Sequence, residues 1–208
     1  RPFLVKEEKL LVLALESEDT KQITTAIKAV LKSCVLTKGI KVEQLPTFDI
    51  EYLFLNIRGK SVGEEVEVNV LCPDDEETYV PTTINIDDIK VIKQEGHDKN
   101  IQIDEKLMME MKYPSLEQFI QTNFDFNNNV SVEQSFDLIA SCISQIFTAE
   151  ESWTVEDVTK KEVQAFLDQM NSSQFKKIEK FFATMPKLSH EISVKNPKTG
   201  VKSTVVLE

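Results

Sequence analysis

Apolar residues are grouped in three stretches near the start of the chain, and in the second stretch they recur every three or four positions, which is the spacing of one buried helix face. The pattern predicts three helices, over residues 5–17, 20–35 and 48–58. In the third helix the apolar residues leave almost no polar side, which is typical of a helix surrounded by protein. Gly59 and Gly63 follow and favour an end of the helix at that point. We therefore expect residues 1–63 to form an N-terminal helical part.

After the third helix the apolar period changes from helical to two. Val66, Val68 and Val70 alternate with polar neighbours, which indicates a half-buried strand. Further extended segments are expected over residues 78–86, 89–92 and 101–112. Pro81 lacks a main-chain donor, so the second strand is expected at an edge or a bulge. Residues 64–112 are thus expected to form an inserted β-module whose acidic tip faces water.

Helical spacing returns in the second half of the chain. The pattern predicts a short helix over residues 115–122 and a long helix that Ser131 caps. The apolar stripe of the long helix runs as far as Phe147, and Trp153 is expected in the connector that follows.

Two further helices are expected before the last strands. Thr159 and Glu162 have the spacing of a capping box, and Ser172 is expected to cap the second of these helices. Residues 113–187 are therefore expected to form a C-terminal helical part. The alternating pattern over residues 188–208, interrupted by Asn-Pro-Lys-Thr-Gly, predicts a C-terminal β-hairpin.

The fold class expected from these elements is α+β, with a mainly helical body, an inserted zinc-ribbon-like β-hairpin module and the C-terminal β-hairpin. The parts are expected to form one compact unit from which the β-module protrudes. The chain starts at Arg1 and stops within a strand-like pattern, so we expect it to be part of a longer protein.

The charge and the cysteines limit the partners. The 35 acidic residues outnumber the 24 basic ones and give a net charge of −11, which repels a phosphate backbone, so no nucleic-acid partner is expected. No stretch reaches the roughly 18 apolar residues of a membrane span, so no membrane is expected either. Three cysteines far apart in sequence favour a reducing compartment, because they form no paired spacing.

Catalytic patterns are weak in this sequence. His97 lies in a polar loop and His190 in a predicted strand, and no serine of the G-x-S-x-G type accompanies them. Five glycines do not supply a glycine-rich phosphate loop. We expect a protein that is not an enzyme, with no small-molecule substrate and no nucleotide cofactor.

The stretch Leu-Cys-Pro-Asp-Asp-Glu-Glu at residues 71–77 raises the question of a metal site. Cys72 and Pro73 begin it like half of a zinc knuckle, but Asp74 and Asp75 stand where a second cysteine is needed. Carboxylates suit calcium or magnesium, yet the spacing of a calcium loop is missing. A solvated acidic turn is the preferred interpretation, with no metal and no other cofactor.

Two places are candidates for contact with a partner protein. The first is the acidic tip, which consists of Asp74, Asp75, Glu76 and Glu77. The second is the pair Phe124 and Phe126, two aromatics in a polar loop that either pack locally or dock on a neighbour. The predicted hairpins also offer sheet edges, which recruit other strands through main-chain hydrogen bonds.

Five stretches in order resemble one family of phage proteins. They are RPFLVKEEKLL, FDIEYLFLNIRGKSVGE, CPDDEET, MKYPSL and FFATMPKLSHEISVKNPKTGVKS. Together they resemble the baseplate hub subunits or hub assembly proteins of T-even-like contractile-tailed phages, over nearly the whole chain. Some relatives carry a second cysteine after Cys-Pro, where this chain has Asp74 and Asp75.

The resemblance implies a non-enzymatic structural or assembly role in the hub of the tail baseplate. It implies other hub and tail proteins as partners, and a place in the virion tail and in the host cytoplasm during assembly. Two alternatives stay open: an assembly chaperone that is absent from the mature virion, and a small non-viral adaptor module.

Overall fold

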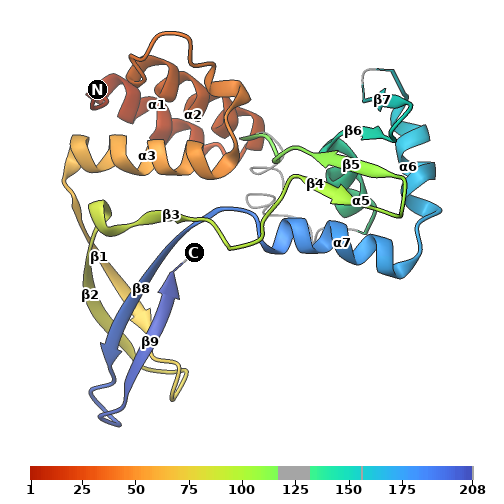
Figure 1. Cartoon of the computed structure of the whole chain (residues 1–208). Coiled ribbons are helices and arrows are strands. Elements are labelled where there is room, and N and C mark those ends of the chain that lie inside the picture. The colour runs from red at the N-terminus through yellow and green to blue at the C-terminus, as the bar shows by residue number, and fades with distance from the viewer. Residues whose placement is uncertain (117–131, 156, 208) are drawn as a thin grey trace. The chain divides into compact units, whose positions relative to one another are not determined.

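The chain divides into two compact units, each of which contains helices and strands (Figure 1). The computed structural model describes residues 1–116, 132–155 and 157–207. Unit 1 is Arg1–Ile92 with Pro186–Glu208, and unit 2 is Lys93–Met185. The α+β class is therefore confirmed. The boundaries differ from the four parts expected from the sequence, because residues 93–112 belong to unit 2 and the last segment joins unit 1.

Unit 1 begins with three α-helices, close to where the apolar pattern predicts them. They are α1 (Val5–Glu16), α2 (Thr20–Cys34) and α3 (Thr47–Val62), with a short 3-10 helix at Val42–Gln44. Asp19 caps α2, because its carboxylate accepts hydrogen bonds from the main-chain N–H groups of Lys21 and Gln22. Ala14 of α1 is buried with Ile23 and Ala26 of α2, so these two helices share a small core.

The helix α3 continues past the glycine that was expected to end it. Gly59 is buried, and a Cβ atom there would lie 3.4 Å from side-chain atoms of Ile86. The main-chain N–H of Gly63 donates to the carbonyl of Gly59 at 2.9 Å, and Gly63 ends the helix with a φ of 118°, which favours glycine. Phe48, Ile50 and Ile57 of α3 are buried, but its middle turn is only half-buried.

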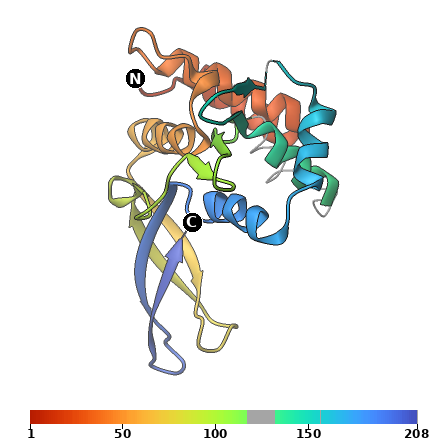
Figure 2. The same cartoon turned by 45° about the vertical axis from the view of Figure 1, so that its right-hand side comes forward.

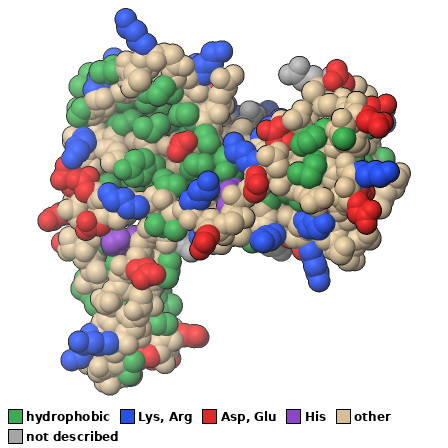
Figure 3. All heavy atoms as spheres, viewed as in Figure 1, with side chains coloured by type: hydrophobic (Ala, Val, Ile, Leu, Met, Phe, Trp, Pro, Cys, Tyr) green, Lys and Arg blue, Asp and Glu red, His purple; other side chains and the backbone are tan. Residues whose placement is uncertain are grey.

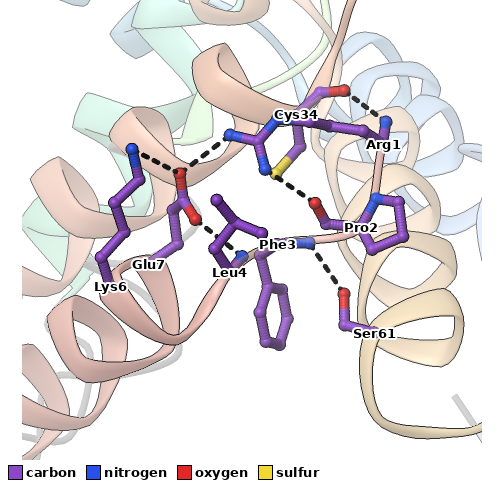
Figure 4. Close-up of polar contacts among 8 residues, drawn as sticks. All are labelled: Arg1, Pro2, Phe3, Leu4, Lys6, Glu7, Cys34 and Ser61. Carbon is purple, nitrogen blue, oxygen red and sulfur yellow. Dashed lines mark hydrogen bonds and ion pairs between the residues drawn. The ribbon is translucent and has the colours of Figure 1, made fainter.

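The segment before α1 is hydrogen-bonded to the ends of the other two helices (Figure 4). The main-chain nitrogen of Arg1 donates to the carbonyl of Cys34, the last residue of α2, at 2.7 Å. The N–H of Phe3 donates to the hydroxyl of Ser61 in α3 at 2.9 Å. These two bonds connect the first residues of the chain to helices far along the sequence.

Glu7 is a buried carboxylate in the same network, with 4% of its surface exposed. It accepts hydrogen bonds from the guanidinium of Arg1 at 2.9 Å and from the N–H of Leu4 at 2.7 Å, while Lys6 lies 3.7 Å away (Figure 4). The Arg1 hydrogen bond is the main reason why the pKa of Glu7 lies below its usual value. A charged group without such partners would be costly to bury.

Two β-hairpins complete unit 1. The first consists of β1 (Glu65–Leu71) and β2 (Tyr79–Asn85), and the second of β8 (Lys187–Lys195) and β9 (Lys202–Leu207). A short strand, β3 (Lys90–Ile92), pairs with the start of β8. The hairpins lie side by side with their turns at the same end in both views (Figures 1 and 2), and α3 contacts β3 and β8. We call residues 65–85 and 187–207 together the arm.

The two hairpins of the arm share a hydrophobic core. Val70 and Ile84 are buried from the first hairpin, and Ile192 and Val194 are buried from the second. Within the first hairpin the register places Val70 opposite Val80 and Asn69 opposite Pro81. Each strand buries alternate residues, as the period of two predicts.

The described residues of unit 2 form a four-stranded antiparallel sheet with helices packed on it. Its strands are β4 (Asn100–Gln102), β5 (Met108–Met111), β6 (Ile143–Phe147) and β7 (Ser152–Thr154), in the order β4-β5-β6-β7. The helices are α5 (Val132–Ser141), α6 (Lys160–Asp168) and α7 (Ser172–Ala183). The core contains Met109 and Met111 of the sheet together with Leu167 of α6 and Ile178 of α7.

Two predictions for unit 2 are wrong. The long helix stops at Ser141, and its second half is β6, which pairs with β5 and places Ile146 opposite Met109. Trp153 lies in β7 and not in a connector. Apolar residues at helical spacing also satisfy a central strand that is covered by a helix, so the choice depended on pairing with β5.

The helix starts of unit 2 are closer to prediction. The capping box of α6 is confirmed, because the N–H of Thr159 donates to Glu162 at 2.7 Å. The cap of α7 is Asn171, one residue before the predicted Ser172. Most of the predicted helix over residues 115–122, and both Phe124 and Phe126, lie outside the described residues.

The expected β-module of residues 64–112 is not one module. Its strands belong to three different sheets, since β1 and β2 pair together, β3 pairs with β8, and β4 and β5 pair within unit 2. Its likeness to a zinc ribbon has no support, because the described residues contain no group of three or more His, Cys, Asp or Glu arranged to hold a metal ion. β3 pairs with β8, far away in sequence, because the main-chain donors and acceptors of a strand need a partner and nearness in sequence does not determine which strand provides it.

Gly59 provides a test of how α3 packs. We expect Gly59→Ala to raise the free energy of unfolding by up to about 1 kcal/mol, because alanine favours the helix and the atoms nearest to its Cβ belong to the side chain of Ile86, at an ordinary contact distance. Gly59→Leu should lower it by about 1–3 kcal/mol through overpacking. Urea denaturation of the full chain measures both changes. Equal destabilisation by the two variants would contradict the proposed packing.

Candidate docking site

The turns of the two hairpins are joined by one carboxylate. Asp74, in the turn between β1 and β2, accepts hydrogen bonds from the side-chain amide of Asn196 at 3.1 Å to each oxygen. It also accepts one from the hydroxyl of Thr199. Asn196 and Thr199 belong to the turn between β8 and β9. We call the hydrogen bonds of Asp74 with Asn196 and Thr199 the clasp, and they join residues more than a hundred positions apart in sequence.

Asn196 has the environment of a structural residue. Only 1% of its surface is exposed, and its own side-chain oxygen accepts hydrogen bonds from the N–H of Lys198 at 2.8 Å and of Thr199 at 3.4 Å. Its main-chain N–H donates to the carbonyl of Val201 at 2.9 Å. One amide side chain therefore closes its own turn and binds the other turn through Asp74.

Asp75 closes the turn of its own hairpin. Its carboxylate accepts hydrogen bonds from the N–H of Glu77 at 3.2 Å, and from the N–H and hydroxyl of Thr78 at 3.0 and 2.6 Å. Glu76 takes a positive φ of 54°, and its N–H donates to the carbonyl of Cys72 at 3.0 Å. The backbone thus turns back tightly between the two strands.

The four acidic residues predicted as a partner site are therefore of two kinds. Asp74 and Asp75 are bonded within the arm, whereas Glu76 and Glu77 are exposed and their side chains make no hydrogen bond or ion pair with the part of the chain that the structure describes. Contact with a partner remains a prediction for all four. Glu76 and Glu77 are the two that are free to make it without disturbing the arm.

The hydrogen bonds hold both aspartates in the charged form. The hydroxyl of Thr199 and then the amide of Asn196 lower the pKa of Asp74, while the hydroxyl of Thr78 makes the largest contribution to lowering the pKa of Asp75. Next to them, burial and then the charge of Asp74 raise the pKa of the Cys72 thiol. Cys72 is fully buried and forms no disulfide, so it packs as a small apolar residue.

Charge is distributed unevenly over the arm. Residues 65–85 contain six acidic residues and no basic one. The second hairpin carries Lys195, Lys198 and Lys202 near its turn, with Lys195 directly opposite Lys202. Figure 3 accordingly shows basic side chains gathered at the end of the arm. The arm therefore presents an acidic hairpin and a basic turn.

The helices of unit 1 expose apolar side chains as well. On α1, these are Val5, Leu10, Val12, Leu13 and Leu15, each more than 40% exposed. Hydrophobic side chains are visible at the surface over α1 to α3 in Figure 3. In unit 2, Trp153 is 41% exposed beside an apolar pocket of about 330 Å³ whose lining includes Ile146 and Phe166.

His97 has a packing environment in unit 2. Its two ring nitrogens lie 3.0 Å from the hydroxyls of Thr184 and Tyr113, and its ring lies against those of Tyr113 and Phe181. Burial lowers the pKa of His97 and favours the neutral ring, which can donate to one hydroxyl and accept from the other. His190, the second candidate base, lies in β8 opposite Leu207.

The residues that sequence reasoning missed are Asn196 and Thr199. Asn-Pro-Lys-Thr-Gly indicates a turn, and the first residue of such a turn often bonds its own backbone. Nothing in that pattern indicates a contact with Asp74, because the distance between the turns is set only when the hairpins pack.

The arm and the exposed α1 surface are features of a chain whose outer faces can contact other proteins. No helix among the described residues is both long enough and apolar enough to cross a membrane. The protein family described as T4 bacteriophage base plate protein matches residues 1–208. The chain belongs to this family. No curated protein and no solved structure gives a match.

Membership of the family determines the general role. The chain is a phage baseplate protein with a structural or assembly role in the tail baseplate, and its partners include other phage baseplate proteins. The family thus places the action of the chain at the baseplate of the virion tail.

The clasp is tested first by removing its amide. We expect Asn196→Ala to lower the free energy of unfolding by about 1–3 kcal/mol, because the buried amide of Asn196 makes hydrogen bonds in both turns and alanine makes none of them. Lys198→Ala, in the same turn but exposed, should change it by less than about 0.5 kcal/mol. Thermal unfolding of the full chain measures both. A similar effect of the two variants would contradict a role for the clasp.

The lowered pKa values of Asp74 and Asp75 predict that the stability of the folded chain decreases in acid. A carboxylate whose folded pKa is depressed contributes stability that is fully present above its unfolded pKa of about 3.9, and this stability is lost as the pH falls through the folded value. The substitution Asp75→Asn keeps the shape of the side chain but removes its negative charge. The stability difference between the native chain and this variant should therefore shrink as the pH falls below about 4. Urea denaturation over a pH series would show the opposite trend if these carboxylates were not ionised in the folded arm.

Proposed function

We propose that this chain is a non-enzymatic component of the central hub of the baseplate, and that it binds other hub and tail proteins through the arm. The observation that carries the proposal is the clasped arm itself. Two hairpins share a core, and Asp74 fixes their turns together, so the outer faces of the arm are held rigid. A rigid surface loses little conformational entropy when it binds, which favours a stable assembly.

The sequence supports the hub over other parts of the baseplate. Two of the five stretches that resemble hub subunits and hub assembly proteins lie in the arm. CPDDEET includes the turn of the first hairpin, and the segment that ends GVKS covers β8, the second turn and the start of β9. The exposed apolar residues of α1 give a second surface on unit 1, so one chain could contact two neighbours. Neither nucleic acid nor a small-molecule substrate is part of this proposal, in keeping with the net charge of −11.

The two forms of the proposal differ in whether the chain remains in the particle. A structural subunit stays in the finished tail and in the virion, whereas an assembly chaperone acts in the host cytoplasm and then leaves. The family match favours both over a non-viral adaptor module. Mass spectrometry of purified tails separates them, since a subunit is present in fixed proportion to the other hub proteins.

The tip of the arm provides a direct test. We expect the double variant Glu76→Lys/Glu77→Lys to fold normally, because both side chains are exposed and make no bond to the described residues. Its association with hub proteins should weaken by about tenfold, which corresponds to about 1.4 kcal/mol of binding free energy. Copurification with hub proteins and the yield of baseplates from infected cells measure this loss.

A matched control reverses two adjacent acidic residues elsewhere. Glu150→Lys/Glu151→Lys changes the net charge equally in an exposed turn of unit 2. This control should assemble like the native chain. Equal loss in the two double variants would indicate a general effect of charge, and unchanged assembly of the Glu76/Glu77 variant would count against contact through the tip.

A further inference from the structure

The outer edge of β1 carries main-chain groups that the hairpin does not use. In an antiparallel pair, hydrogen-bonded positions alternate with positions whose N–H and C=O groups point outward. The main-chain N–H of Cys72 donates to the carbonyl of Thr78, and that of Ile86 donates to the carbonyl of Glu64, both at 2.8 Å. The main-chain groups of the even-numbered residues of β1 therefore point toward β2. The residues whose main-chain groups point away from β2 are Glu65, Glu67, Asn69 and Leu71.

Nothing described in the structure pairs with this edge. Over residues 1–116, 132–155 and 157–207, β1 and β2 form a sheet of two strands, and β2 is the partner of β1. The four outward-facing residues are all exposed. A row of unpaired donors and acceptors along a seven-residue strand is a template for another strand.

The other long edges of the arm are protected against such pairing. Pro81 stands opposite Asn69 at a position that is not hydrogen-bonded, so the N–H that proline lacks is missing from the outer edge of β2. On the second hairpin, Lys195 and Lys202 lie opposite each other, and lysines on edge strands oppose strand addition. Residues Glu65–Leu71 contain neither proline nor lysine.

The two faces of β1 determine which strand would fit beside it. Glu65 and Glu67 lie on the outward face, in a stretch without any basic residue. Val66 and Val68 are half-buried on the inward face, and Val68 packs against the core of the arm. A strand added here extends both faces, so it would place basic residues beside the glutamates and apolar residues beside the valines.

We propose that the outer edge of β1 binds an extended segment of another baseplate protein in which basic and apolar residues alternate. The segment adds a third strand to the first hairpin through the main-chain groups of Glu65, Glu67, Asn69 and Leu71. The inference rests on the proposed function in taking a baseplate protein as the partner. The charge complementarity of Glu65 and Glu67 selects a basic strand over an acidic one.

Asn69 allows this edge to be blocked without breaking the hairpin. Asn69→Pro removes an N–H that the β1–β2 ladder does not use, and places on β1 the same protection that Pro81 gives to β2. Asn69→Thr keeps the N–H and favours a strand, so it is the matched control. Thermal unfolding of the full chain verifies that both variants are folded.

The probe is a capped peptide of about nine residues in which lysine and valine alternate, long enough to cover the strand. It is titrated into the nitrogen-15-labelled full chain. We expect the amide signals of Glu65, Glu67, Asn69 and Leu71 to shift most. Asn69→Pro should weaken binding by at least about tenfold, and Asn69→Thr should bind like the native chain.

A second variant keeps the test valid if Asn69→Pro does not fold. Glu65→Lys/Glu67→Lys leaves the edge open but reverses its charge, and it should prefer a peptide in which glutamate and valine alternate. Binding that is equal for native chain and Asn69→Pro, or shifts centred on residues 74–77, would overturn the inference, because charge attraction alone would then account for the peptide.

The proposed function is judged separately, by deleting the gene that encodes this chain. Normal baseplates after deletion would refute the proposed function. If deletion abolishes baseplates and Asn69→Pro restores them fully, the function stands and the strand-docking site is wrong. If Asn69→Thr restores them and the folded Asn69→Pro does not, both are supported.

Discussion

Burial of one face of each hairpin against the other is the constraint on which the arm depends. A two-stranded hairpin is only marginally stable in water, because one of its faces remains uncovered. Here Val70 and Ile84 cover Ile192 and Val194, and each hairpin supplies the second layer that the other lacks. The polar clasp at the turns follows from this packing, since Asp74 meets Asn196 only when the two sheets are in register.

The acidic character of the arm has two separate consequences. Asp74 and Asp75 are held ionised by hydrogen bonds and stabilise the turns, so part of the negative charge serves the fold. Glu65, Glu67, Glu76 and Glu77 face outward and remain available to a partner. A chain of this charge associates most readily with basic surfaces, which limits the baseplate neighbours that it fits.

The prediction of elements from sequence succeeded where a local signal was strong. Thr159 and Glu162 identified the start of α6, and alternating valines identified β1, because capping and strand alternation involve neighbouring residues. It failed at Gly59 and at Ile143. Gly59 stays helical because Ile86 packs over it, and Ile143 begins a strand because β5 is available to pair. Both outcomes depend on residues far away in sequence.

The sequence by itself determined the α+β class, the helices of unit 1, both hairpins and the acidic tip, because these depend on periodicity, turn residues and charge. The tertiary structure alone decided which strands share a sheet, that the last hairpin returns to the first unit, and that Asp74 binds Asn196 and Thr199. The physical reason is that apolar faces and unpaired polar groups specify that a partner is needed. Which partner is used depends on how the whole chain packs.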